Sequence, residues 1–300
     1  MNSPRVSREP SPLQVWFSTI RPRTLVASLA PVCVGSALAW TQDSFRLDSF
    51  SASLLGALAI QTVVNFHNDL KDYEKGADTD ERLGPPRACQ MGWLTKAQLK
   101  KAIGLSLLIG ALAGLYLVWL TGWPLLAVGV LGVVSAFAYT GGPYPLAYVG
   151  IAEVFVLVFF GFAAVVGTVF AHGAQISPEA WWLGGAIGAA SNTLLVVNNL
   201  RDREGDRKVG KRTTAVRFGG QFARFQYAAY WTAAFWCTVA AARMDHPGLY
   251  FSLVLAIPTF LAAQRVFRTD GKALNHELAA AGRLHAFLGI LLTMGLVLCG

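Results

Sequence analysis

The chain has 300 residues, of which 54% are hydrophobic and 14% are charged. Soluble globular domains carry about 25% charged residues, and disordered chains carry few apolar ones, so the composition excludes both classes and indicates an integral membrane protein. The formal net charge of +8 is not by itself a sign of a nucleic-acid partner, because the basic residues lie almost entirely on one side of the predicted membrane spans.

A membrane-spanning helix needs about 20 mostly apolar residues. The chain has nine such stretches, at residues 24–41, 50–70, 97–119, 123–140, 149–171, 179–200, 221–242, 247–265 and 281–299. None alternates with the period of two that a membrane barrel strand would show. The sequence therefore predicts an all-α bundle of about nine transmembrane helices. Residues 1–20 are expected to form a cytoplasmic tail, and residues 21–300 a single polytopic domain.

The basic residues predict the orientation of this bundle. With nine spans drawn, 23 of the 25 Lys and Arg residues lie on one side, and only Arg46 and Arg243 lie on the other. Positively charged loops stay in the cytoplasm, so the N-terminus and the loops after the second and sixth spans are predicted to face it. The expected location is the cytoplasmic (inner) membrane.

The second predicted span ends in a polar cluster. Acids and amides recur there at intervals of three and four residues, which places them on one face of a helix: Asn65, Asn68, Asp69 and Asp72. His67 points off this face and is expected to be structural. A loop with Asp78, Arg82 and Arg87 follows. We call residues 65–87 the first motif.

The sixth predicted span ends in a similar way. Asn198, Asp202 and Asp206 follow one another at intervals of four, again on one helix face, and Lys211 and Arg212 come next. We call residues 198–212 the second motif. Both motifs stand at the carboxyl ends of their helices, where the helix dipole favours cations.

Carboxylate and amide oxygens in such clusters suit magnesium, which prefers carboxylates, water and substrate phosphates to a closed protein cage. Two facing clusters could hold magnesium ions that bridge a diphosphate, with nearby Arg and Lys side chains neutralising the remaining charge. The competing explanation is that charged loops merely solvate helix ends. That explanation does not account for Asn65 and Asn198, which would cost about 1–3 kcal/mol each if left unpaired in an apolar environment.

Both motifs resemble those of the UbiA-type membrane prenyltransferases. The similarity rests on Asn65-x-x-Asn68-Asp69-x-x-Asp72 with Arg82-x-Gly84-Pro85-x-Arg87, and on Asn198-Asn199-x-Arg201-Asp202-x-x-x-Asp206. It extends to residues 21–35 and 139–153 and covers nearly the whole chain. Gly76 and Asn198 replace acids common in the superfamily, as they do in the branch that acts on 1,4-dihydroxy-2-naphthoate. Whether Asp78 substitutes for the missing ligand at position 76 stays open.

The resemblance implies a magnesium-dependent aromatic prenyltransferase. Such enzymes ionise a polyprenyl diphosphate, and the allylic cation alkylates an aromatic ring inside an apolar bundle that excludes water, capped by the two motif loops. In the naphthoate branch the ring carboxylate leaves as CO2, giving demethylmenaquinol for menaquinone synthesis. Transfer to 4-hydroxybenzoate or homogentisate, or of a phytyl group, is the alternative. Prenyl length and oligomeric state are not predicted, and neither a nucleic acid nor an obligate protein partner is expected.

This reading assigns roles to the motif residues. The expected magnesium ligands are Asn68, Asp69, Asp72, Asp202 and Asp206. The expected diphosphate-binding residues are Asn65, Asn198, Arg82, Arg87 and Lys211. The residues expected to take part in catalysis are Asp72, Asp206, Glu153 and Tyr139.

Glu153 and Tyr139 each have a second interpretation. An ionisable residue inside a span usually faces a cavity, so Glu153 is expected to orient or deprotonate the acceptor, although it could instead be a helix-end carboxylate. Tyr139 could stabilise an allylic cation with its ring, or could belong to an interfacial aromatic belt.

Three other classes fit less well. A transporter of an anionic metabolite usually binds near the bilayer midplane between matching halves, whereas these clusters end helices. A quinone-binding subunit would be expected to show histidine ligands. An alcohol phosphotransferase would concentrate its acids in one helical region.

Overall fold

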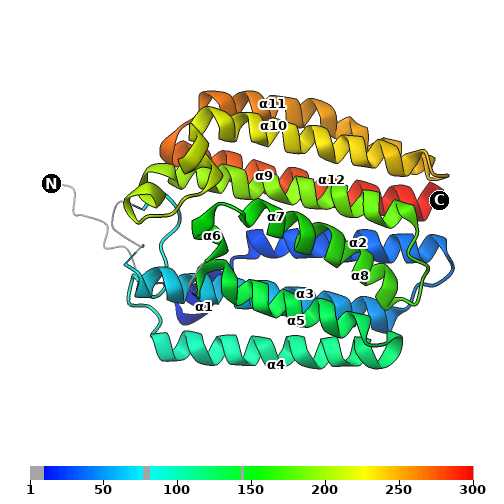
Figure 1. Cartoon of the computed structure of the whole chain (residues 1–300), viewed down its shortest axis with the longest axis horizontal. Helices are drawn as coiled ribbons and strands as arrows, with labels where there is room; N and C mark the ends of the chain where they lie inside the picture. Colours follow the sequence, from blue (N-terminus) through cyan, green and yellow to red (C-terminus); the bar gives the residue numbers. More distant parts are fainter. Residues whose placement is uncertain (1–9, 77–81, 143–144, 300) are drawn as a thin grey trace.

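The computed structural model describes residues 10–76, 82–142 and 145–299, and within these ranges the chain is helical and contains no strand. The helices are α1 (Pro12–Ile20), α2 (Pro22–Thr41), α3 (Leu47–Glu74), α4 (Lys96–Thr121), α5 (Pro124–Thr140), α6 (Leu146–Val149), α7 (Ala152–Val156), η1 (Leu157–Ala163), α8 (Ala164–Ala171), α9 (Pro178–Lys208), α10 (Thr214–Ala242), η2 (Pro247–Leu255), α11 (Ala256–Arg268), η3 (Gly271–Ala273) and α12 (Leu274–Cys299). Figure 1 shows the long helices lying side by side along one axis.

The described part of the chain contains seven helical segments long and apolar enough to cross a membrane. Six of the nine predicted spans map onto single segments of this kind, and a seventh, residues 149–171, maps onto Ala152–Ala171. The remaining two differ. Helix α5 has only 17 residues. Helix α10 is long enough but is not apolar enough to be counted among these segments, and its backbone leaves helical geometry at Gly219.

The span expected at residues 149–171 is not one regular helix. Gly150, at φ 74°, separates the single turn of α6 from α7, and α7 continues into the π-helical segment η1 before α8 resumes. Gly161 of η1 lies so close to Gly184 and Gly188 of α9 that a Cβ on any of the three would meet neighbouring backbone. Small residues allow membrane helices this approach, so Gly184 and Gly188 form a contact inside the bundle.

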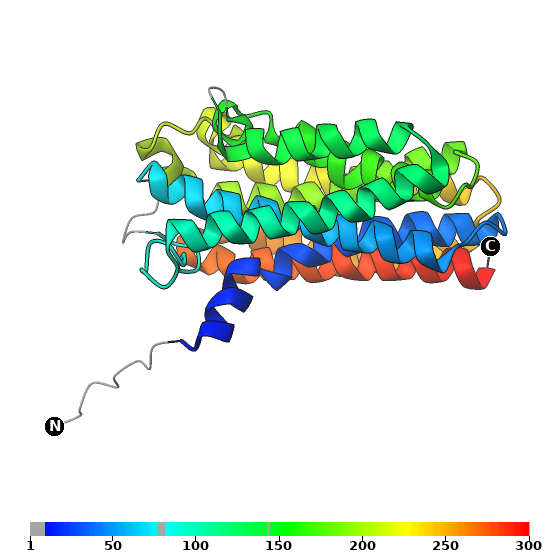
Figure 2. The ribbon, with the colours of Figure 1, turned by 90° about the horizontal axis from the view of Figure 1, so that it is seen from below.

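Residues expected in the N-terminal tail form helix α1. Ser11 and Gln14 make a reciprocal capping box at its start. Val15 is buried, and the Trp16 ring packs edge-on against Phe66 of α3, with centroids 5.9 Å apart. Figure 2 shows α1 leaving the bundle at an angle. It is therefore docked on the helix that carries the first motif.

The apolar core has two parts. The larger joins α2, α8, α9, α10, α11 and α12, and the smaller joins α1, α3, α4 and the loop before α4. The carboxyl-terminal ends of α3 and α9 lie at the same end of the bundle, opposite the C-terminus of the chain (Figure 1). The packing therefore brings together two motifs that are more than 100 residues apart in sequence.

Candidate active site

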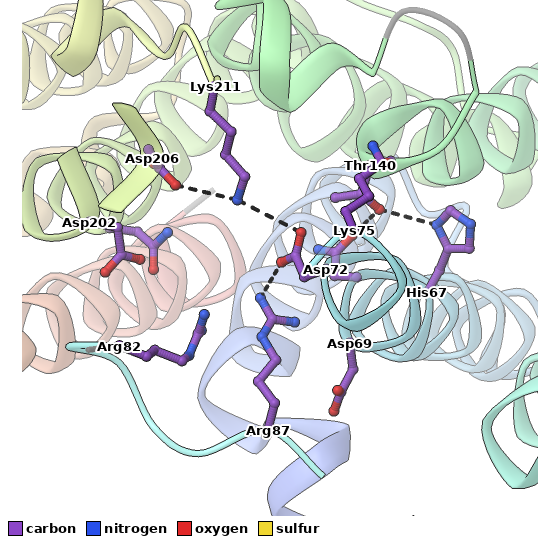
Figure 3. Close-up of polar contacts among 12 residues, drawn as sticks. His67, Asp69, Asp72, Lys75, Arg82, Arg87, Thr140, Asp202, Asp206 and Lys211 are labelled. Atoms are coloured by element: carbon purple, nitrogen blue, oxygen red, sulfur yellow. Dashed lines mark hydrogen bonds and ion pairs between the residues drawn. The ribbon is translucent and has the colours of Figure 1, made fainter. Parts of the chain in front are cut away.

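Lys211 connects the two motifs. Its Nζ lies 3.7 Å from an oxygen of Asp72 on α3 and 3.3 Å from an oxygen of Asp206 on α9. Figure 3 shows the lysine reaching down between the two acids. Burial opposes its charge, but the carboxylates of Asp72 and Asp206 outweigh burial and raise the pKa of Lys211 above its ordinary value. Lys211 is therefore a stable cation between two acids.

The loop of the first motif is held by the acids of α3. Arg87 Nη2 donates to Asp72 Oδ2 at 2.6 Å, and both side chains are almost completely buried. Asp69 accepts a bond of 3.2 Å from the backbone N–H of Ala88. Figure 3 shows Asp69 directed away from the group formed by Asp72, Lys211 and Asp206. Asp69 therefore holds the loop, whereas Asp72 faces the second motif.

Asn65 is buried and fixes the corner between α1 and α2. Its Nδ2 donates to the carbonyl of Ile20 at 2.7 Å and to Thr24 Oγ1 at 2.9 Å, while its Oδ1 accepts from Gln61. These hydrogen bonds occupy both the donor and the acceptor of the Asn65 amide inside the bundle, as is usual for a buried polar side chain. They also position Arg21, whose backbone at this corner is left-handed (φ 57°).

Asn68 is part of a second polar chain at the end of α5. Thr140 Oγ1 donates to Asn68 Oδ1 at 2.9 Å and lies 3.2 Å from His67 Nδ1. Lys75 Nζ donates to the Thr140 carbonyl at 2.8 Å. His67 and Asn68 therefore both lie within hydrogen-bond distance of one hydroxyl, that of Thr140.

In the second motif, Arg201 organises the other polar groups. Its guanidinium donates to both oxygens of Asp202, at 2.7 and 2.6 Å, and to Asn198 Oδ1 at 2.8 Å. The arginine is only 4% exposed. A buried fork of this kind fixes the orientation of the carboxylate it binds.

The ring of Tyr148 in α6 contacts two lysines, one from each motif. Lys75 Nζ is 4.2 Å and Lys211 Nζ 5.3 Å from the ring centroid. The backbone N–H of Arg212 donates to the Tyr148 carbonyl at 2.9 Å. These contacts join α6 to the end of α3 and to the loop after α9.

A cavity of about 1530 Å³ runs through the bundle from this polar end. Asn68, Arg82, Asn198 and Arg201 line it near the motifs, and its walls are mostly apolar and continue past Phe159 to Leu117 and Leu125 at the opposite end. Pockets for drug-sized ligands occupy roughly 300–1,000 Å³. This cavity therefore suits a long apolar chain with an anionic head.

The two residues proposed for catalysis outside the motifs differ in position. Tyr139 lines the cavity. Glu153 is 5% exposed and is not part of the cavity lining, and its Oε1 accepts a bond of 2.6 Å from Thr214 Oγ1 at the start of α10. Asn192 of α9 also donates to the Glu153 carbonyl at 3.0 Å. Glu153 thus ties α7 to the helix that follows Lys211.

Comparison with known proteins identifies the family. Residues 28–297 match the model of the UbiA prenyltransferase family. The chain belongs to this family. The resemblance predicted from the two motifs is thereby confirmed.

Two relatives of this UbiA-family chain are 1,4-dihydroxy-2-naphthoate octaprenyltransferases. That of Haemophilus influenzae is 32% identical over 95% of this chain and 96% of its own length. That of Mycobacterium tuberculosis is 40% identical over 71% of this chain and 72% of its own. A solved UbiA homolog from Archaeoglobus fulgidus, bound to DMAPP and Mg2+, aligns with a TM-score of 0.70 at 17% identity, covering 94% of this chain and 99% of that one. This last likeness shows the fold.

The acids of this UbiA-family chain fit a magnesium ion that takes some of its ligands from the protein and the others from a bound substrate. Among the residues described, no three His, Cys, Asp or Glu side chains converge on one point. Buried Oδ1 atoms of Asp69 and Asp72 nevertheless lack hydrogen bonds. Magnesium commonly takes one or two carboxylates together with phosphate oxygens and water, so an incomplete protein donor set is compatible with it. Asp78 lies outside the described residues.

Sequence reasoning overlooked several residues at this site. Thr140, Lys75 and Asn275 were not singled out, and Arg201 and Tyr148 entered only as parts of the family resemblance. Arg201 carried a usable signal, because an arginine one residue before an acid at a buried helix end needs a partner. The others depend on contacts between distant segments and leave no local pattern.

Proposed function

We propose that this chain transfers a polyprenyl group from polyprenyl diphosphate to 1,4-dihydroxy-2-naphthoate, releasing diphosphate and CO2 and forming demethylmenaquinol in menaquinone synthesis. The observation that carries the proposal is the long apolar cavity that ends at the two facing motifs. The naphthoate acceptor is supported by the names of the relatives from Haemophilus influenzae and Mycobacterium tuberculosis.

The polar end of the cavity would hold the diphosphate. Arg82, Arg87 and Lys211 would bind its oxygens, with Asn65 and Asn198 ordering the groups around them. Magnesium, when held by Asn68, Asp69, Asp72, Asp202 and Asp206, would neutralise charge on the departing diphosphate. Binding would require Lys211 to exchange its contacts with Asp72 and Asp206 for contacts with phosphate.

Beyond the diphosphate, the chain would protect the reactive carbon. Apolar walls exclude water, so the allylic cation left when the C–O bond breaks meets the aromatic ring instead of hydroxide. Tyr139 lines this cavity, and its ring would stabilise the cation. The acceptor's ring carbon would then form the new C–C bond and lose its carboxyl group as CO2.

Glu153 is proposed to support catalysis through the Lys211 loop. Its carboxylate holds Thr214, three residues after Lys211, so it would set the position of that lysine. Its sequence-based role as a proton acceptor remains a proposal, and it would require Thr214 to release the carboxylate.

We also propose the topology expected from sequence: nine helices crossing the cytoplasmic membrane, a cap formed by the loops after α3 and α9, and the N-terminus on the cytoplasmic side. The support is the distribution of Lys and Arg, because 23 of 25 lie on the side of the motifs when nine spans are drawn. Cysteine accessibility labelling at both ends of the bundle in intact cells would test it.

Purified protein in nanodiscs tests the proposed reaction directly. It would receive Mg2+, octaprenyl diphosphate and either 1,4-dihydroxy-2-naphthoate or 4-hydroxybenzoate, with Asp206→Asn as the inactive control. Mass spectrometry is expected to find a prenylated naphthoquinol lacking the carboxyl mass. Prenylated benzoate alone would refute the naphthoate acceptor, and no product from folded protein would refute prenyl transfer.

A further inference from the structure

Asn275 lies outside both motifs, on the first turn of α12, yet its side chain contacts segments of both. Its Oδ1 accepts a bond of 2.9 Å from Arg201 Nη1 in the second motif. Its Nδ2 donates to the carbonyl of Leu83 in the first motif at 2.8 Å. A third bond, of 2.9 Å to the carbonyl of Lys272, ties the amide to η3, the short helix before α12.

The bond to Arg201 completes the surroundings of a buried guanidinium. Nε and Nη2 of Arg201 are engaged by Asp202 and Asn198, and Nη1 is engaged by Asn275. Because the guanidinium is planar, fixing Nη1 also fixes the plane in which Asp202 is held. Asn275 thereby controls the direction of an acid that it does not touch.

The bond to Leu83 acts on the loop that carries the arginines of the first motif. This loop packs directly on Arg201: a Cβ at Gly84 would lie 3.1 Å from Arg201 Nη2 and 3.3 Å from Arg82 Nη2. Figure 3 shows Arg82 on the side of the site away from Thr140, which is also the side of Asp202. The same amide therefore sets the distance between the Arg82 loop and the second motif.

We propose that Asn275 is a positioning residue that keeps the loop of residues 82–87 in register with Arg201 and Asp202, so that both motifs meet one diphosphate. The identity of the substrate in this inference rests on the proposed function. The positioning of the loop by Asn275 does not depend on it. Asn275 also lines the cavity close to Asn198 and Arg201. Loss of its bonds would leave the individual ligands in place and loosen their relative positions.

Three variants separate the two bonds from general stability. Asn275→Leu removes all three bonds, and Asn275→Asp keeps an acceptor for Arg201 while losing the donor to Leu83 and Lys272. Gln42→Leu is the matched control, because Gln42 also bridges two segments, with bonds of 3.2 and 2.9 Å to Gln175, but between the end of α2 and the loop before α9. That bridge lies at the end of the bundle opposite the motifs.

In kinetic assays, Asn275→Leu is expected to raise the KM for polyprenyl diphosphate and the Mg2+ concentration for half-maximal rate about tenfold, as for loss of a hydrogen bond to a buried charge. The KM for the aromatic acceptor should stay within about twofold. Asn275→Asp should fall between Asn275→Leu and wild type, and Gln42→Leu should match wild type in all three constants. Equal changes in Asn275→Leu and Gln42→Leu would overturn the proposal.

Hydrogen–deuterium exchange gives a readout that does not need turnover. In Asn275→Leu, amides of residues 82–92 are expected to exchange faster than in wild type, whereas in Gln42→Leu they should not. Unchanged exchange there would overturn the positioning role even in an active enzyme. If exchange changes but wild type transfers no prenyl group, the proposed function fails and the positioning role stands.

Discussion

Asp72 and Asp206 are both expected to be essential for prenyl transfer, but their removal should affect stability unequally. Asp72 and Arg87 form a buried pair, with side chains 4% and 7% exposed, and removing one partner of such a pair costs about 3–5 kcal/mol. Asp206 pairs with Lys211, which retains Asp72 at 3.7 Å when Asp206 is neutralised. The cost of Asp206→Asn should therefore be about 1 kcal/mol, that of one lost hydrogen bond, because Lys211 keeps a charged partner.

Thermal unfolding in detergent measures this difference. The midpoint of Asp72→Asn should lie about 5–10 °C below that of Asp206→Asn, at the usual conversion of about 2–4 °C per kcal/mol. The double variant Asp72→Leu/Arg87→Met should recover much of the loss, because apolar side chains replace both members of the buried ion pair together. Neither single variant nor the double variant should form product.

Equal midpoints for Asp72→Asn and Asp206→Asn would refute the reasoning, because they would mean that the Arg87 pair contributes no more than the Lys211 contact. Detectable product from the double variant, at more than about 1% of the wild-type rate, would instead refute the role of Asp72 at the diphosphate. The two results are independent, so stability and catalysis are tested separately.

Four further outcomes are expected. Lys211→Met should raise the KM for polyprenyl diphosphate about 10- to 100-fold, as for loss of a charged hydrogen bond, and an unchanged KM would remove Lys211 from the site. The pKa of Lys211 is raised in the folded protein, so its charge stabilises the fold fully at pH values below the pKa of about 10.5 in the unfolded chain. The difference in unfolding midpoint between wild type and Lys211→Met should therefore be constant from pH 7 to 9. It should shrink only as the pH rises through the pKa of the folded state. Gly132→Leu, at a cavity-lining position with no atom within 4 Å of the added Cβ, should reduce turnover of octaprenyl diphosphate more than that of geranyl diphosphate, without loss of stability. Chelation with EDTA should abolish product formation, and added Mg2+ should restore it; turnover in EDTA would contradict the metal requirement.

Much of the site could be predicted from sequence because helical spacing is local information. Intervals of three and four place Asn68, Asp72, Asp202 and Asp206 at the ends of two helices, and the charge distribution puts those ends on one side. The partners of these groups could not be predicted. Asp69 binds a loop N–H, and Glu153 holds Thr214 outside the cavity lining, because each contact depends on how separate helices pack.

The features of the fold likewise separate into those that the sequence determined and those that tertiary packing decided. Hydropathy alone determined that the chain is a membrane-embedded helical bundle, since apolar runs of this length have few other stable solutions in lipid. Three features depended on tertiary packing. Gly161 in the π-helical segment η1 packs against the glycines of α9, and Trp16 of the docked helix α1 packs against Phe66. Asn275 forms three hydrogen bonds, one of them to a residue 192 positions away in the sequence. Sequence specified which groups are available and on which helix face, because those follow from chain geometry. Tertiary structure decided which groups pair with one another, because burial makes each polar group depend on the partner that packing brings within reach.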